Sequence, residues 1–250
     1  MRRSAAIDEL VEAAHASGLV LPAAALARFE TYLETLLLWR RRLSLTGAST
    51  ALAIVREHVA DAFFVAPLIR RGFRVADLGS GAGFPGVPLA IVCPEATVVL
   101  VEARRKKANF LREVVRQTNL DNVEVAEERA ESLTDHVGSY DLIVSRAVWP
   151  LEEFLRVGEP LLRRGGLLTA MKGPKGLAES LPHKHPGFSQ PEVIYYQLHG
   201  GVRRVLLVYR RLGPAASEGS AGPSAEGFGP QAGPLPARTP EASGGRVGSR

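Results

Sequence analysis

Apolar positions in the first part of the chain recur at helical spacing. Residues 10–14 mark a first helical face, and Pro22 opens a longer apolar run that we expect to end at Gly47. A third helix is expected to begin after an N-cap at Ser49 and to stop at Gly72. The front of the chain is therefore predicted to be helical.

From residue 73 onward the period changes to that of short, mostly apolar strands. These are Phe73–Leu78, Thr97–Glu102, Val123–Ala126, Asp141–Ser145, Leu167–Met171, Glu192–Leu198 and Val202–Arg210. Helical segments near residues 87–92, 104–118, 131–136 and 151–162 separate the first five. This alternation predicts an α/β, Rossmann-like fold with a mostly parallel sheet. The last two segments predict a C-terminal antiparallel hairpin that turns at His199 to Gly201.

The last 38 residues, from Gly213, differ in composition, with nine Gly, six Pro and one bulky aromatic residue. Such a segment cannot bury enough apolar surface to order itself. We therefore expect an N-terminal helical extension (1–72), a sheet-containing domain (73–212) and a disordered tail (213–250).

Composition excludes some classes of protein. Hydrophobic residues are 46% and charged residues 23%, close to a globular average. The apolar stretch of residues 87–93 is far short of the roughly 20 residues that span a bilayer, and no other apolar stretch of the sequence approaches that length. The single cysteine, Cys93, allows no intrachain disulfide, which makes a reducing cytoplasm the default compartment. The net charge is +5, and only 5 of the 31 cations are Lys. This arginine excess fits phosphate recognition and also a plain compositional bias.

The first predicted strand runs directly into the glycine-rich residues 79–86, GSGAGFPG. In an open parallel sheet this turn is where a ligand meets the backbone. Gly81, Gly83 and Gly86 satisfy the dinucleotide pattern, and Glu102 follows at the position where a carboxylate could bind a ribose. This match alone leaves an NAD-dependent oxidoreductase open.

Asp77, two residues before the loop, separates two cofactor classes. At the mouth of the loop its carboxylate would repel a pyrophosphate. S-adenosyl-L-methionine carries an ammonium and a sulfonium and no phosphate, so an acidic neighbour favours it. The alternative is that Asp77 only caps a helix or a turn.

Several motifs together resemble one family. The stretch VADLGSGAGFPGVPLAI, followed by VEARRKKANFLREV, RAE, DLIVSRA and MKG, and preceded by WRRRLSLT and HVADA, is similar to GidB proteins. These are bacterial enzymes that use S-adenosyl-L-methionine to methylate a guanine N7 in small-subunit (16S) ribosomal RNA. The resemblance runs from about Trp39 to Arg210 and implies that residues 73–212 form the methyltransferase domain.

The same resemblance implies partners and surroundings. It implies small-subunit ribosomal RNA as the partner, naked or within a partly or fully assembled subunit, and a cytoplasmic monomer. A non-catalytic RNA-binding ribosome assembly factor that keeps the fold is the remaining alternative.

The resemblance also implies a set of cofactor-site residues that follow the first four strands. They are Gly79 and Phe84 against the cofactor, Glu102 at the ribose, Ala103 and Arg104 beside the adenine, Ala130 and Glu131 at the adenine edge, and Arg146 between cofactor and substrate. For two residues of this set the sequence also allows a purely structural role. Arg104 opens a charged run typical of a solvated helix face, and Ala130 fits plain helix packing.

Guanine N7 carries a free lone pair, so its methylation needs alignment and exclusion of water rather than a general base. Ser145, Arg146 and Ala147 follow the fourth strand, in place of the acidic or amide residue and two prolines of exocyclic-amine methyltransferases. A catalytic Arg146 donating to guanine O6 would leave N7 free to react. The alternative is an arginine that holds a phosphate or the methionine carboxylate.

Other basic clusters are candidates for RNA contact or for solvated faces. They are Arg40 to Arg42, Arg70, Arg71 and Arg74, Lys172 and Lys175, His183 to His185, and Arg203 and Arg204. The long segment from Lys172 to Pro191 is expected to be a mobile cover. His183 and His185 have metal-pair spacing without a third ligand nearby, so we expect no metal.

The composition of the tail gives a first testable prediction. Truncation after Leu212 should leave the melting temperature and the cofactor affinity nearly unchanged, because the removed residues contribute no core. Calorimetry of the full-length and shortened proteins measures both quantities. A large drop in melting temperature would show that the tail docks.

Overall fold

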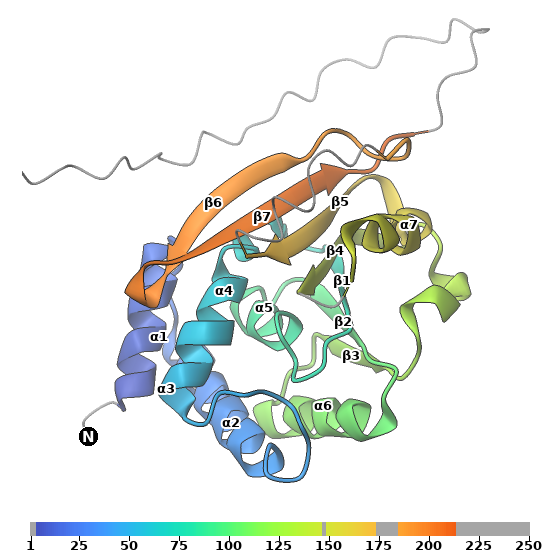
Figure 1. The fold of residues 1–250 in the computed structure, drawn as a ribbon. Helices are drawn as coiled ribbons and strands as arrows, with labels where there is room; N and C mark the ends of the chain where they lie inside the picture. The colour runs from blue at the N-terminus through green and yellow to red at the C-terminus, as the bar shows by residue number, and fades with distance from the viewer. Residues whose placement is uncertain (1–3, 147–148, 174–184, 214–250) are drawn as a thin grey trace, which may run out of the picture. The chain divides into compact units, whose positions relative to one another are not determined.

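A computed structural model describes residues 4–146, 149–173 and 185–213. Its centre is a seven-stranded sheet with strand order β3-β2-β1-β4-β5-β7-β6 (Figure 1). The strands are β1 (Arg74–Leu78), β2 (Thr97–Val101), β3 (Val123–Ala126), β4 (Tyr140–Arg146), β5 (Leu162–Lys172), β6 (Glu192–Leu198) and β7 (Val202–Arg210). The first five strands pair in parallel, whereas β7 is antiparallel to both β5 and β6. The predicted α/β fold with a terminal hairpin is confirmed.

Helices precede the sheet, as predicted, with different boundaries. They are α1 (Ala5–Ala16), α2 (Ala23–Trp39), α3 (Ala51–Ile54), the π-helical turn η1 (Val55–Val59), α4 (Ala60–Phe63) and the 3-10 turn η2 (Ala66–Leu68). The end of α2 predicted at Gly47 is wrong, because Arg40 to Arg42 offer no apolar side to bury after Trp39. The third helix is capped by Thr50 rather than Ser49, since Thr50 Oγ1 accepts from the amide of Ala53 at 3.1 Å.

The connections between the parallel strands match the expected helical segments. They are α5 (Gly86–Val92), α6 (Arg105–Thr118), the 3-10 turns η3 (Ala130–Ser132) and η4 (Thr134–His136), and α7 (Leu151–Leu161). Asn119, directly after the last residue of helix α6, has a φ of 49° and so takes the left-handed conformation common after a helix.

Alternate residues of β1 enter two separate cores. Val75 packs with residues of α2, α5 and α6 on one face of the sheet, and Ala76 and Leu78 pack with α7 and β5 on the other. Residues of the N-terminal helices belong to the first of these cores. The helices at the front of the chain therefore share the core of the sheet rather than forming a core of their own.

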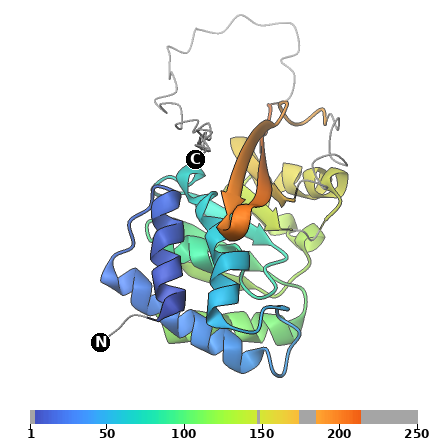
Figure 2. The ribbon, with the colours of Figure 1, turned by 60° about the vertical axis from the view of Figure 1, so that its left-hand side comes forward.

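The β6–β7 hairpin lies against the N-terminal helices (Figure 2). At its turn, η5 (His199–Gly201), the His199 ring lies 3.0 Å from the Glu9 carboxylate of α1. Further along, the Tyr196 ring of β6 stacks on Phe64 at a centroid distance of 4.1 Å.

Among the described residues, no helix is long and apolar enough to cross a bilayer.

Candidate active site

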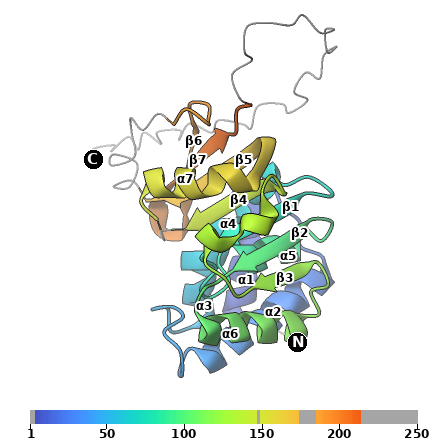
Figure 3. The same cartoon turned by 90° about the vertical axis from the view of Figure 1, so that its right-hand side faces the viewer.

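The predicted site residues lie along one edge of the sheet. Gly79, Glu102 and Arg146 stand at the carboxyl ends of β1, β2 and β4, and Ala130 follows β3. These four strands are neighbours in the sheet, and their shared edge is seen from the side in Figure 3. The ends of β1 and β4 are joined directly, because the Ser145 hydroxyl donates to the Leu78 carbonyl at 2.9 Å. The structure thus brings together residues that are 67 positions apart in the sequence.

The glycine loop turns sharply at this edge. Gly79, Gly81 and Gly83 have φ values of 79°, 57° and 95°, a region that side chains with a Cβ rarely adopt. A Cβ on Gly83 would meet Val87 at 2.7 Å. The buried Tyr32 hydroxyl of α2 donates to the carbonyl of Ala82 at 2.8 Å, which fixes the loop from below.

Asp77 is not at an open mouth of the loop, so that part of the sequence interpretation is wrong. Its side chain has no exposed surface, and its Oδ2 accepts from the first amide of α5, on Gly86, at 3.0 Å. Burial raises the pKa of Asp77 to about 7. Its Oδ1 has no hydrogen-bond partner among the described residues. The carboxylate acts here as a helix cap beneath the loop. This is the alternative interpretation given for Asp77 from the sequence.

Glu102 joins two backbone segments at the edge. One oxygen accepts from the Gly81 amide at 3.0 Å and the other from the Arg104 amide at 2.8 Å. Each carboxylate oxygen keeps a second lone pair, so the group can accept further hydrogen bonds. Ala103 and Arg104, which follow directly, are exposed.

Ala130 and Glu131 begin η3, with Ala130 buried and Glu131 exposed. They contribute to a pocket of about 180 Å³ that also includes Leu133, Arg156 and Leu161. A larger cavity of about 370 Å³ lies among Arg70, Arg71 and residues 92–96, at the opposite, amino edge of the sheet. It does not coincide with the glycine loop, so we do not assign the cofactor to it.

Arg146 ends β4 and turns toward the helical segment in front of the sheet. One terminal nitrogen donates to the carbonyl of Glu57 at 3.1 Å and lies 3.4 Å from Asp61 Oδ2, and the other donates to His58 Nδ1. Its guanidinium also lies 5.8 Å from the centre of the Phe84 ring. Burial lowers the pKa of Arg146 from its ordinary value, although the group stays charged.

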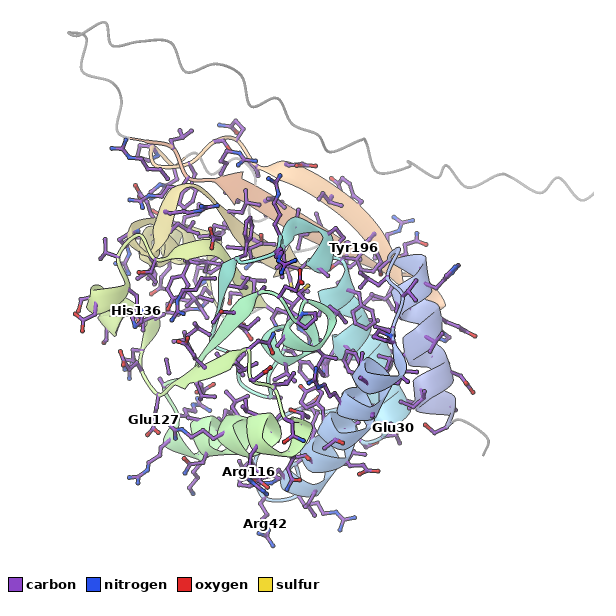
Figure 4. All side chains as sticks on the ribbon, turned by 180° about the vertical axis from the view of Figure 1, so that it is seen from behind. Glu30, Arg42, Arg116, Glu127, His136 and Tyr196 are labelled. Atoms are coloured by element: carbon purple, nitrogen blue, oxygen red, sulfur yellow. The ribbon has the colours of Figure 1, made fainter. Side chains whose placement is uncertain are left out.

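A buried network holds this arginine in place. The carboxylate of Asp61, 2% exposed, accepts from the Tyr196 hydroxyl at 2.5 Å and lies 3.8 Å from Arg204. Burial raises the pKa of Asp61, while Tyr196 and the two arginines oppose that shift. Figure 4 shows Tyr196 where the hairpin meets the N-terminal helices. The network therefore ties α4, β4, β6 and β7 together.

His58 is neutral in this arrangement. Burial, followed by the nearby Arg146, lowers the pKa of His58 to about 4. Because Nδ1 accepts from Arg146, the ring proton is on Nε2, which lies 2.6 Å from Thr46 Oγ1. The ring also packs against Phe84 at 4.8 Å. Both ring nitrogens are engaged, so His58 is not free to act as a base.

The residues present fit an S-adenosyl-L-methionine cofactor. The loop presents backbone without Cβ atoms at Gly79, Gly81 and Gly83, and a Cβ on Gly81 would occupy space 3.8 Å from the Gly79 carbonyl. The spare acceptor capacity of Glu102 suits a ribose diol. Phe84 adds a mostly buried apolar ring at the same loop.

The other basic clusters divide between the two edges. Arg74 lies at the amino edge and pairs with Glu124 at 2.6 Å, so it does not border the site. Arg204 joins the Asp61 network. Lys175 and His183 lie outside the described residues, as does most of the predicted cover. In the described part of the chain no group of three or more metal-ligating side chains is found.

The sheet topology and the glycine loop have the arrangement of the Rossmann-like methyltransferase fold. Solved structures with this fold include a tRNA methyltransferase from Aquifex aeolicus, with a TM-score of 0.51, 18% identity, and coverage of 61% of this chain and 68% of that one. A SAM-dependent O-methyltransferase from Thermotoga maritima also has a TM-score of 0.51, with 16% identity and 71% of each chain covered. These similarities show the fold.

The GidB family model, rRNA small subunit methyltransferase G, matches residues 25–199, and the chain belongs to this family. Ribosomal RNA small subunit methyltransferase G of Stenotrophomonas maltophilia (strain K279a) is 47% identical over 142 residues, covering 57% of this chain and 66% of the relative. That match spans slightly less than two thirds of the relative's length. The Xylella fastidiosa (strain 9a5c) protein of the same name is 40% identical over 187 residues, covering 72% and 84%. The resemblance stated from the motifs is confirmed.

Sequence reasoning missed the residues that surround Arg146. His58 and Asp61 lie in the HVADA motif, which pointed to the family without indicating a role for either residue. Tyr32 and Tyr196 had no local signal, because their partners are 50 and 135 positions away. Only the folded chain shows that they support the loop and the arginine.

The lowered pKa of His58 gives a prediction about stability and pH. Unfolded chains protonate this histidine below about 6.5 and the folded protein only below about 4, so its contribution to stability is lost as the pH falls through this window. The contribution of Asp77 to stability changes with pH in the opposite direction, because folding raises its pKa. The wild-type protein should therefore lose melting temperature relative to His58→Gln between pH 6.5 and pH 4. Parallel melting curves for the two proteins would contradict this.

Proposed function

We propose that this protein methylates N7 of a guanine in small-subunit (16S) ribosomal RNA, with S-adenosyl-L-methionine as the methyl donor. The observation that carries the proposal is the family match over residues 25–199, which includes the glycine loop. The geometry supports it, since the histidine nearest Arg146 is neutral and has both nitrogens engaged. A reaction at N7 needs no base. The nicotinamide-dependent alternative is not favoured.

The residues at the edge of the sheet have separate roles in this proposal. Gly79, Glu102, Ala103 and Arg104 hold the cofactor at β1 and β2, and Ala130 and Glu131 border its adenine. When bound, the cofactor supplies an electrophilic methyl group on a sulfonium. Phe84, a residue that is only 9% exposed, provides apolar cover on the loop side of that region.

Arg146 orients the base. A guanidinium has five N–H donors, and among the described residues three are directed to Glu57, Asp61 and His58. The remaining two can donate to guanine O6, which leaves N7 unobstructed. The Asp61 network keeps the plane of the guanidinium fixed, so the base is held without reorganisation of the arginine.

The partner and setting follow from the reaction. The proposed substrate is 16S ribosomal RNA, either naked or within a partly or fully assembled small subunit. The protein acts as a monomer in the cytoplasm, where bacterial ribosomal RNA is made.

Methyl transfer to 16S rRNA tests the proposed function directly. The purified full-length chain is incubated with cofactor carrying a labelled methyl group and with 16S rRNA, as a transcript and in small subunits from cells that lack the enzyme. Chemical cleavage at N7-methylguanine then locates the label. Label at another atom of the RNA would contradict the N7 assignment, and no label in either substrate would contradict the function.

Replacement of Glu102 tests the cofactor site. Glu102→Ala should weaken binding of S-adenosyl-L-methionine by tenfold or more, because each hydrogen bond to a charged group contributes about 1.5–3 kcal/mol. Glu128→Ala removes an exposed carboxylate two residues beyond β3 and serves as the control. Calorimetric titration measures both affinities. An unchanged affinity in Glu102→Ala would remove this residue from the site.

Replacement of Arg146 separates orientation from charge. Arg146→Lys keeps the charge but cannot reproduce a planar fork with three directed donors. Turnover at saturating RNA and cofactor should fall by roughly tenfold or more. Arg204→Lys is the control, since Arg204 also approaches Asp61 but does not end β4. If Arg146→Lys turns over normally, Arg146 is an electrostatic anchor and not an orienting group.

A further inference from the structure

Two basic segments that are far apart in the sequence meet at the carboxyl edge. Helices α2 and α6 pack in opposite directions. Arg28, early in α2, donates to the carbonyl of Asn119 beyond the end of α6 at 3.2 Å. At the other end, the ring of Trp39 lies 5.8 Å from that of Phe110. The residues after α2 are therefore next to the residues that begin α6.

This packing creates a surface that we call the basic rim. Its seven members are Arg40, Arg41, Arg42, Arg104, Arg105, Lys106 and Lys107. Arg40 and Lys107 are partly buried, and the other five are exposed. The sequence has no acidic residue between positions 35 and 56, or between 103 and 112, so the rim carries only one sign of charge. Figures 1 and 3 place the segment after α2 beside the start of α6.

The cations of the rim differ from several arginines elsewhere in the molecule. Arg74, Arg112 and Arg116 each pair with a glutamate within 3 Å. None of the seven rim side chains forms an ion pair within the described parts of the chain. Three of them occupy the first turn of α6, which has no acidic residue and no side-chain cap. Cations at a helix N-terminus are unfavourable unless an anion compensates them.

The rim also reaches the candidate active site. Lys107 Nζ lies 3.8 Å from the point where a Cβ on Gly81 would be, so the inner end of the rim touches the glycine loop. Arg42, labelled in Figure 4, points away from the body of the protein. The surface thus leads from solvent to the site.

We propose that the basic rim binds consecutive phosphates of the 16S rRNA strand that carries the target guanine, an inference that rests on the proposed function. Five of the seven rim side chains are exposed, and cationic groups without an ion-pair partner are the groups that displace counterions from a nucleic acid backbone. Because the two segments form one surface, a single RNA strand contacts both. The rim positions the RNA, and Arg146 orients the base.

The experiment compares two double variants of the full chain with one control. Arg41→Gln with Arg42→Gln neutralises the α2 side of the rim, and Arg105→Gln with Lys106→Gln neutralises the α6 side. The control joins Arg116→Gln, about 16 Å along α6 from Arg105, with Arg164→Gln at the start of β5. Affinity for 16S rRNA is measured against salt, with a naked transcript and with small subunits.

Each rim variant should bind both forms of the RNA about fivefold or more weakly. Each should also show a salt dependence of log Kd that is smaller by about 1.4 to 1.8, the value for two lost phosphate contacts. The control should match the wild-type protein, and cofactor affinity and melting temperature should be unchanged in all three. Wild-type affinity and slope in either rim variant would overturn the proposal.

Two further outcomes separate this proposal from others. A loss confined to small subunits, with transcript binding intact, would assign the rim to a ribosomal protein and overturn the RNA contact. A wild-type protein that binds 16S rRNA but transfers no methyl group to it would contradict the proposed function alone. In that case the salt slopes of the variants still decide the role of the rim.

Discussion

The buried carboxylate of Asp61 is the group on which the arrangement around the candidate active site depends. Its burial would favour the neutral acid, and Tyr196, Arg146 and Arg204 supply the hydrogen bond and charges that oppose this. Removing one partner from a buried ion pair typically costs about 3–5 kcal/mol, because the other charge is left uncompensated. Asp61 therefore couples the position of Arg146 to the presence of the hairpin.

The same interaction explains why Arg146 turns toward the helices. A guanidinium at the end of a strand would be free to rotate on its long side chain. The carbonyl of Glu57, exposed to Arg146 in the π-helical turn η1, and the neutral ring of His58 fix the plane from one side. Such π-turns are common at functional sites, where they redirect one or two backbone groups.

The sequence predicted most of the fold because the strands are short apolar runs separated by turn residues. Strands β3, β6 and β7 have the predicted boundaries, and the hairpin was readable from Gly200 and Gly201. The end of α2 was missed because no proline or glycine marks it; helix formation stops where the apolar face stops. Asp77 was misplaced because its position two residues before the loop does not reveal that it faces α5.

The candidate site was predictable in part, for a physical reason. Residues at the carboxyl ends of parallel strands must meet at one edge, so Glu102 and Arg146 could be placed together from strand assignments alone. Their supporting partners come from the N-terminal helices and from the β6–β7 hairpin. Contacts between residues so far apart in the chain have no signature in the sequence. The basic rim belongs to the same category, since it exists only because α2 and α6 pack in opposite directions.

One hydrogen bond has a consequence for fragments of this protein. The Tyr32 hydroxyl, from the middle of α2, is bonded to the Ala82 carbonyl inside the glycine loop. A fragment that begins at the first strand would contain every residue of the loop and yet lack the group that holds it. A fragment that keeps this support for the loop has to include α2, even though this helix precedes the first strand of the sheet.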